Sequence, residues 1–220
     1  MKTSRTVFDR RSRLSGRVRV VEDAAERRLI VGGDTLSVYP LGRDWSRLAR
    51  EYWWHAVAVA PVPARPSALF VGLGGGTSLH VLRARQSPRS LTVIERDPVI
   101  LRAAREWFGL HGVPGVEYLI GDADVVARWL VAARRRFDFV FEDATYAEPL
   151  DRSLPLARAL TAVLSPRGVL VMNRHRRGDA HHLAATLRPV FAEVRLQRVR
   201  REAENVLVCC VRPISGGAGA

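Results

Sequence analysis

Three groups of residues in this sequence have the types and the spacing that bind a nucleoside. The first is a glycine-rich turn at 72–76, Gly-Leu-Gly-Gly-Gly, which follows an apolar run and precedes an amphipathic segment. Glycine lets the backbone turn tightly and lets a nucleotide lie against the free amides of the next helix. Glu95 lies about 20 residues further along, where an acidic side chain accepts hydrogen bonds from both hydroxyls of a ribose. Asp122 follows a third apolar run, where it is placed for an adenine edge or, alternatively, for capping a helix.

These groups stand at the ends of apolar runs that alternate with amphipathic segments. Such alternation predicts strands joined through helices, which must run parallel with right-handed crossovers. We predict strands at 67–73, 90–95, 116–120, 137–142, 169–173, 193–200 and 205–211, and helices at 78–84, 97–108, 122–136, 154–164 and 181–191. The expected fold is α/β, a three-layer, doubly wound sheet of seven strands with the last one antiparallel. In such sheets a ligand binds outside the carboxyl ends of the strands, where the strand order reverses.

Smaller segments flank this predicted domain, which we assign to residues 63–213. Residues 1–16 carry a cluster of arginines and form a basic arm that we expect to be disordered. Residues 17–62 form a small β segment of two or three antiparallel strands, followed by a helix at 45–59 and a proline-rich linker. Serine, glycine and alanine dominate residues 214–220, which we expect to be a flexible tail.

Four motifs at the ends of the predicted strands carry a resemblance to a known family. They are VGLGGGT at 71–77, VIERDP at 93–98, GDA at 121–123 and DFVFED at 138–143. With them, residues 67–173 resemble the class I S-adenosylmethionine-dependent transferases, which have a Rossmann-like fold, and most closely their spermidine synthase-like branch. The aromatic run EYWWH at 51–55 is also similar to the N-terminal part of that branch.

The resemblance implies S-adenosylmethionine, or its decarboxylated form, as the cofactor. It implies that Gly72, Gly74 and Gly76 contact the methionyl end of the cofactor. Glu95 then binds the ribose and Asp122 the adenine. The neighbouring residues that complete the predicted cofactor-binding set are Gly75, Arg96 and Ala123.

Two departures from the family pattern concern the acceptor. Aminopropyltransferases usually have an aspartate within the glycine-rich turn, where this chain has Gly75, and another after the fourth strand, where it has Tyr146. Both acids help to hold a cationic diamine, and an unpaired buried ammonium is strongly unfavourable, so putrescine recognition would need Glu142 or Glu148 as a substitute. We predict instead that Tyr146 and Trp54 contact an aromatic or otherwise apolar acceptor, with core packing as the alternative for Trp54.

Asp143 ends the fourth predicted strand, across the crevice from the glycine-rich turn. A sulfonium cofactor already activates its leaving group, so the protein only has to align the nucleophile, exclude water and accept a proton, without a metal. We therefore predict that Asp143 is the catalytic residue that orients or deprotonates the acceptor, with capping of the following loop as the alternative. His175, beyond the fifth strand, is a second candidate or simply a rim residue.

The composition limits the compartment and the partners. Lysine and arginine number 35 against 22 acidic residues, a net charge of +13, which makes the basic arm a candidate contact for nucleic acid. The alternative explanation is that arginine used in place of lysine reflects a GC-rich genome. Two cysteines fit a reducing compartment, and no apolar run approaches the roughly 18 residues of a membrane span. We expect a cytoplasmic protein that does not contact a membrane.

The leading hypothesis is a methyltransferase-like transferase that uses S-adenosylmethionine and acts on a small-molecule acceptor. The first alternative is a divergent polyamine aminopropyltransferase that uses decarboxylated S-adenosylmethionine. The second is a non-catalytic module that binds a nucleoside or RNA. The sequence lacks the motifs of HExxH metalloproteases, P-loop NTPases, nucleophile-elbow hydrolases and CxxC redox proteins. A homodimer is compatible with the exposed edge of the small β segment.

Overall fold

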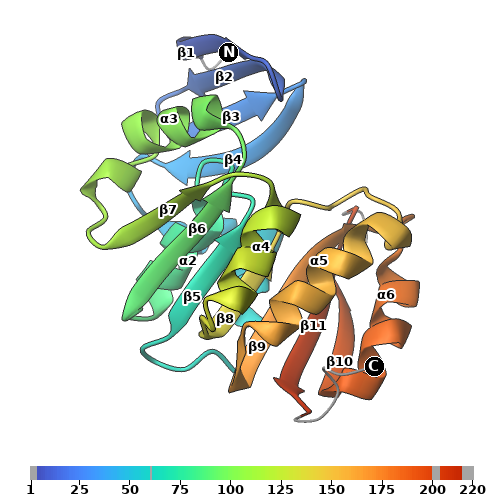
Figure 1. The fold of residues 1–220 in the computed structure, drawn as a ribbon. Coiled ribbons are helices and arrows are strands. Elements are labelled where there is room, and N and C mark those ends of the chain that lie inside the picture. The colour runs from blue at the N-terminus through green and yellow to red at the C-terminus, as the bar shows by residue number, and fades with distance from the viewer. Residues whose placement is uncertain (1–3, 60, 200–203, 215–220) are drawn as a thin grey trace.

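The computed structural model describes residues 4–59, 61–199 and 204–214, which form two sheets, the smaller lying across one end of the larger (Figure 1). The smaller sheet is antiparallel, with its strands in the order in which they follow one another along the chain. Its strands are β1 (Arg5–Ser12), β2 (Gly16–Glu22), β3 (Glu26–Val31) and β4 (Asp34–Pro40).

The larger sheet has seven strands in the order β10-β11-β9-β8-β5-β6-β7. β5 pairs in parallel with both β6 and β8. From β5 the chain adds β6 and β7 on one side and then β8 and β9 on the other, so the strand order reverses between β5 and β8. β11 is antiparallel to both of its neighbours, β9 and β10. This arrangement confirms the predicted doubly wound α/β sheet with its last strand antiparallel. The strands are β5 (Ser67–Val71), β6 (Ser90–Glu95), β7 (Val116–Ile120), β8 (Phe137–Glu142), β9 (Leu164–His175), β10 (Phe191–Arg198) and β11 (Asn205–Pro213).

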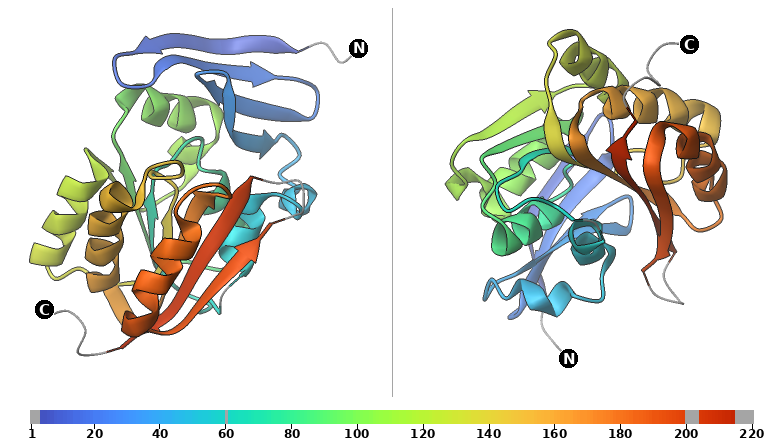
Figure 2. Two further views of the ribbon diagram at one scale, coloured as in Figure 1. Left: turned by 90° about the vertical axis from the view of Figure 1, so that its right-hand side faces the viewer. Right: turned by 90° about the horizontal axis from the view of Figure 1, so that it is seen from below.

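Helices cover both faces of the larger sheet, as Figures 1 and 2 show. A hydrophobic core lies on each face of the larger sheet. Because successive side chains of a strand point to opposite faces, β5 contributes side chains to both cores. Leu69 and Val71 pack under α4, α5 and α6, whereas Ala68 and Phe70 pack under α1, α2 and α3. The helices are α1 (Tyr52–Ala58), α2 (Thr77–Arg85), α3 (Pro98–Trp107), α4 (Ala123–Ala132), α5 (Leu150–Ala162) and α6 (Ala180–Leu187), with short 3-10 turns at η1 (Trp45–Leu48), η2 (Leu110–Gly112) and η3 (Arg188–Val190).

The structure corrects the prediction of a disordered basic arm, because residues 5–12 form β1. Phe8 of β1 is buried with Val18 and Ile100, so the small sheet packs on α3. The arginines that suggested disorder are partly neutralised across the hairpin, where Arg17 pairs with Asp9 at 2.5 Å. Apart from Ile214, the predicted tail at 214–220 lies outside the described residues, as do residues 1–3.

Two predicted boundaries also change. The single helix expected at 45–59 is divided into η1 and α1, with Asp44 capping η1 by accepting a hydrogen bond from the amide of Ser46 at 3.1 Å. The strand expected at 169–173 is longer, because β9 begins at Leu164 and pairs with β8 through an irregular register there. Among the helices that the structure describes, none is long and apolar enough to cross a membrane.

Candidate active site

The strand reversal opens into a cavity of about 690 Å³ at the carboxyl ends of β5, β6 and β8. A volume of this size suits a nucleoside-sized ligand. The hairpin of β3 and β4 forms the opposite wall through Val31, Asp34 and Leu36. The cavity therefore lies between the two sheets, at the place where a ligand was predicted from the sequence.

The glycine-rich turn is narrowly confined on the cavity side. Gly72 has φ +82°, and a β-carbon there would lie 3.1 Å from the amide nitrogen of Ala144. Gly74 has φ +52°, and its β-carbon would lie 2.7 Å from Ser37 Oγ. Gly72 and Gly74 both line the cavity, so the turn is pressed between β4 and the loop after β8.

Gly75 and Gly76, which were also predicted to contact the cofactor, face the small sheet and the segment after α3. Neither lines the large cavity. A β-carbon at Gly75 would lie 2.7 Å from the ring of Phe108, and one at Gly76 would lie 2.9 Å from Leu110. The amide of Gly75 also donates to Ser37 Oγ at 2.7 Å. These two glycines thus fit the turn against the small sheet and the end of α3.

Glu95 stands at the end of β6 and lines the cavity, and its carboxylate is already anchored to the protein backbone. One oxygen accepts from the amide of Leu73 at 3.0 Å and the other from the amide of Asp97 at 2.8 Å. Burial raises the pKa of Glu95, and these amide hydrogen bonds oppose the rise. Each oxygen keeps a second lone pair, so the carboxylate can also accept from ligand hydroxyls. The neighbouring Arg96 lines the same wall.

Asp122 caps α4, which is the alternative considered for it from the sequence. Its carboxylate accepts from the amides of Asp124 at 3.0 Å and Val125 at 3.4 Å. The side chain is exposed, and Asp122 is not among the residues that line the cavity, whereas its neighbours Gly121 and Ala123 are.

Asp143 lies on the cavity wall directly after β8, and both of its carboxylate oxygens accept hydrogen bonds. The Tyr52 hydroxyl donates to one oxygen at 2.9 Å, and the Asn173 side-chain amide donates to the other at 2.7 Å. Burial raises the pKa of Asp143 to about 7, although both hydrogen bonds lower it. At neutral pH, a carboxylate with this pKa can take a proton from the nucleophile of a substrate.

The predicted acceptor residues separate in the structure. Tyr146 lines the cavity, with its ring packed edge-on against His175 at 5.5 Å between centroids. Trp54 lies outside this cavity, where its ring stacks beneath the guanidinium of Arg85 at 4.8 Å and packs on the core under α1 and α2. The core-packing alternative is therefore what the structure shows for Trp54.

Two acidic residues that sequence reasoning missed lie on the Tyr146 side of the cavity. Asp34 comes from β4, and Glu204 directly precedes β11. Burial raises the pKa of Tyr146 to about 12, and the charges of Glu204, Asp143 and Asp34 add to the rise. Nothing local in the sequence marks either residue, because each is brought to the cavity by long-range packing.

Curated relatives of this chain are transferases. A zebrafish eEF1A lysine and N-terminal methyltransferase is 30% identical over 156 residues, which are 66% of this chain and 23% of that protein. A polyamine aminopropyltransferase of Vibrio vulnificus is 28% identical over 152 residues, 67% of this chain and 50% of that protein. The chain thus spans about a quarter to a half of the length of these relatives. No protein-family model matches the sequence.

Solved structures with the same architecture include both kinds of transferase. The spermidine synthase of Thermotoga maritima aligns with a TM-score of 0.67 and 16% identity, over 94% of this chain and 72% of that one. Human methyltransferase-like protein 13, solved in complex with SAH, aligns with a TM-score of 0.57 and 22% identity, over 79% of this chain and 81% of that one.

The chain has a class I, spermidine synthase-like transferase fold. The relatives support a transferase, as the sequence predicted.

The cavity of this transferase fold has a charge opposite to that of the whole protein. Among the described residues, four acidic side chains line it, those of Asp34, Glu95, Asp143 and Glu204, and one basic side chain, that of Arg96. The chain as a whole carries a net charge of +13. Within the described residues, no group of three or more histidine, cysteine or acidic side chains is arranged to bind a metal ion. Among the described residues, the lining of the cavity thus has more acidic than basic side chains.

Proposed function

We propose that the protein is an S-adenosylmethionine-dependent methyltransferase acting on a small-molecule acceptor. The observation that carries the proposal is the cavity at the strand reversal, where the described lining has four acidic side chains and one basic side chain within a strongly basic chain. A sulfonium cation is stabilised by such surroundings, because carboxylates attract it and it needs no other counter-ion. The methyltransferase relatives and the complex of a structural neighbour with SAH support the same cofactor.

Each wall of the cavity fits one part of this cofactor. We assign the methionyl end to the backbone of Gly72 and Gly74, and the ribose to Glu95. We assign the adenine to the wall made by Gly121 and Ala123, beside the helix that Asp122 caps. When bound, the cofactor supplies a methyl group that is activated for in-line displacement.

Asp143 is the proton acceptor in this proposal. Tyr52 and Asn173 fix its two oxygens, so that the carboxylate keeps one orientation toward the acceptor. With its pKa near 7, Asp143 takes the proton from an amine or hydroxyl nucleophile as the new bond to carbon forms. Tyr146 is placed to contact the acceptor from the same side of the cavity.

Aminopropyl transfer from decarboxylated S-adenosylmethionine is the second candidate, and the two unpredicted acids favour it. Asp34 and Glu204 come from elements outside the family motifs, and their charges act on Tyr146, one of the two positions where the family's diamine-binding acids are missing. Carboxylates in these positions would stabilise a cationic diamine and a cofactor without its own carboxylate.

Calorimetric titration of the purified protein with each cofactor separates the two candidates. The methyltransferase proposal expects tighter binding of S-adenosylmethionine, and the second candidate expects tighter binding of the decarboxylated form. Mass spectrometry of the products after incubation with amines then identifies the transferred group. Binding of neither cofactor, combined with RNA binding that weakens steeply with salt, would overturn both in favour of the non-catalytic module.

Substitution of Asp143 tests its assigned role. Asp143→Asn should leave cofactor affinity within about twofold and lower turnover by about 100-fold or more, the usual contribution of a general base. Asp138→Asn is the matched control, because Asp138 lies at the other end of the same strand, where it accepts from Ser67 and Ser165. Equal turnover in the two variants would refute the role of Asp143.

A further inference from the structure

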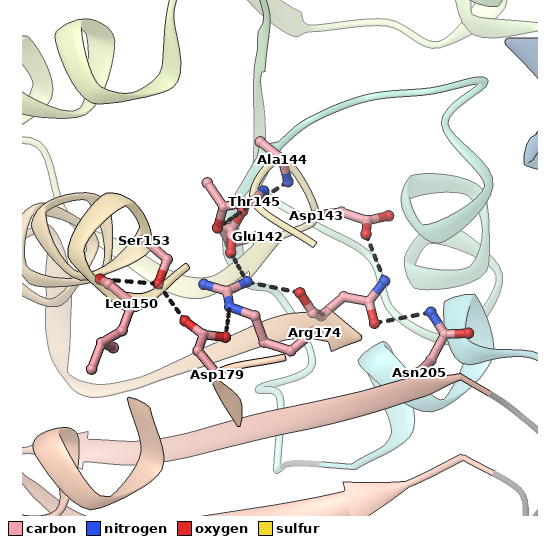
Figure 3. A network of polar contacts seen from close by, with 10 residues as sticks. Glu142, Asp143, Ala144, Thr145, Leu150, Ser153, Arg174, Asp179 and Asn205 are labelled. Carbon is pink, nitrogen blue, oxygen red and sulfur yellow. Dashed lines mark hydrogen bonds and ion pairs between the residues drawn. The ribbon is translucent and has the colours of Figure 1, made fainter. Parts of the chain in front are cut away.

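A buried cluster of charged residues lies directly behind Asp143 (Figure 3). Its centre is Arg174 of β9, which is only 1% exposed. The guanidinium Nη1 donates to the Glu142 carboxylate and to the main-chain carbonyl of Asn173, the latter at 2.7 Å. Arg174 Nε lies 3.4 Å from Asp179 Oδ1, an ion pair without hydrogen-bond geometry. The guanidinium thus donates hydrogen bonds on the side of Glu142 and Asn173 and makes only an ion pair on the side of α6.

Glu142 connects Arg174 to the loop that carries Asp143. One Glu142 oxygen accepts from Arg174, and the other accepts from the amides of Ala144 and Thr145, both at 2.7 Å. These two amides directly follow Asp143 in the chain. The position of the Glu142 carboxylate therefore determines the path of the backbone at Asp143.

Asn173 makes the second connection. Its carbonyl accepts from Arg174, while its side-chain amide donates to Asp143 at 2.7 Å. The side-chain oxygen of Asn173 accepts from Asn205 at 3.1 Å, which fixes the orientation of the amide. A displaced Asn173 would carry this hydrogen bond away from Asp143.

We propose that Arg174 is a positioning residue that fixes Asp143 from two sides, through Glu142 on β8 and through Asn173 on β9. The effect of Arg174 on turnover rests on the proposed function, whereas its effect on Asp143 itself does not. The assignment rests on the contacts of Arg174, Glu142 and Asn173 in this chain.

Packing alone does not account for an arginine at this position. Leu170 and Met172, on the same face of β9, are buried and apolar and belong to the core under α5 and α6. A further apolar side chain would continue that core without the desolvation that a buried charge requires. The charge is explained by the contacts that it makes with Glu142 and Asn173.

The charged and titratable groups that face Asp143 act in opposite directions. Burial has the largest effect and raises the pKa of Asp143, Glu142 raises it further, and Arg174 lowers it. Tyr52 from α1 lowers it by donating a hydrogen bond. Tyr146, from the same loop as Asp143, is a further titratable neighbour. Removing the two charges of the Glu142 and Arg174 pair singly should therefore move the titration of Asp143 in opposite directions.

The test measures the titration of Asp143 in the whole chain by carbon NMR of protein labelled at the aspartate carboxyls, with Asp143→Asn assigning the signal. Arg174→Gln should raise the titration midpoint and Glu142→Gln should lower it, each by about 0.5 pH or more. In a turnover assay, Arg174→Gln should lower kcat about tenfold while the dissociation constant of the cofactor changes less than twofold. Circular dichroism confirms that each variant is folded.

Ser153→Ala is the matched control. Ser153 is equally buried and donates to Asp179 at 2.5 Å, on the far side of Arg174 from Asp143. A merely structural role for the cluster predicts similar effects of Ser153→Ala and Arg174→Gln, whereas positioning predicts an unchanged Asp143 midpoint in Ser153→Ala.

The proposal is overturned if folded Arg174→Gln and Glu142→Gln leave the midpoint unchanged or move it in the same direction. If Arg174→Gln does not fold, the direction in which Glu142→Gln moves the titration midpoint of Asp143 tests the proposal. Absence of turnover in the unsubstituted protein would refute the proposed function and leave the NMR result as the test of positioning.

Discussion

Removal of the Glu95 carboxylate is the perturbation whose size follows most directly from the structure. Glu95→Ala deletes the partner expected for two ribose hydroxyls, and hydrogen bonds to a charged group contribute about 1.5 to 3 kcal/mol. Losing one such contribution corresponds to about 10- to 150-fold weaker binding. The same change leaves the amides of Leu73 and Asp97 without the acceptors they now have at 3.0 and 2.8 Å.

The lost amide partners add an effect on stability. Each buried, unsatisfied amide is unfavourable by about 1 kcal/mol or more, while removal of a buried carboxylate relieves part of that loss. A net destabilisation of about 2 kcal/mol would lower Tm by about 4 to 8 °C in a chain of this size. Two measurements are needed, calorimetric titration with S-adenosylhomocysteine at a temperature where both proteins are folded, and thermal unfolding by circular dichroism.

Glu117→Ala is the control for Glu95→Ala. Glu117 lies on the neighbouring strand β7 and pairs with Arg135 at 2.7 Å, away from the cavity lining. We expect ligand affinity unchanged by this substitution. Ligand affinity unchanged in Glu95→Ala as well would refute the placement of the ribose, and with it the argument that assigns each cavity wall to one part of the cofactor.

Three further predictions test other parts of the structure. Turnover should rise as pH increases through about 7, because Asp143 must lose its proton to act as a base, and Asp143→Asn should remove this dependence from the pH–rate profile. Gly74→Ala should destabilise the fold by about 1 to 2 kcal/mol in urea unfolding, since φ is +52° there; Gly112→Ala, with open space at its β-carbon, should not. Trp54→Ala should leave cofactor affinity unchanged in calorimetry. Weakened affinity would indicate that Trp54 contributes to the binding site.

Stability should respond to pH through Asp143 in a direction that can be worked out. Its pKa is about 7 in the folded chain and about 3.9 when unfolded. Between these values the folded state binds more protons, so this group contributes stability below pH 4 that is lost as the pH rises to 7. In urea unfolding, the free energy of unfolding should decrease less between pH 4 and 7 in Asp143→Asn than in the unsubstituted protein. An identical decrease in both proteins would contradict the raised pKa of Asp143.

The sequence allowed prediction of those site residues that local pattern determines. Glu95 and Asp143 follow strands whose apolar runs are unambiguous, and the doubly wound order then brings them to one cavity. Asp122 shows the limit of a motif, because a carboxylate after a strand and before a helix can cap the helix as readily as it contacts a ligand. The structure shows that Asp122 caps α4 and is exposed, and exposure is a property of packing that the motif does not contain.

Other parts of the site depend on contacts between distant segments. Tyr52 reaches Asp143 from 91 positions earlier in the chain, and no periodicity or spacing relates the two. Asp34 lies in the small β segment, for which the sequence predicted antiparallel strands but no contact with the ligand, although the hairpin of β3 and β4 forms a wall of the cavity. β1 was missed because its arginines suggested an exposed arm, whereas the burial of Phe8 and Ser12 and pairing with β2 order it.

An acidic cavity in a basic protein implies an unusual dependence of the ligand's association rate on ionic strength. A cationic ligand approaching from bulk solvent first meets the repulsion of a chain with net charge +13, and only at short range the attraction of the carboxylates. Added salt screens the long-range repulsion beyond about 8 Å at physiological strength but acts much less inside the pocket. The association rate constant of such a ligand should therefore increase with moderate salt, the reverse of ordinary electrostatic steering.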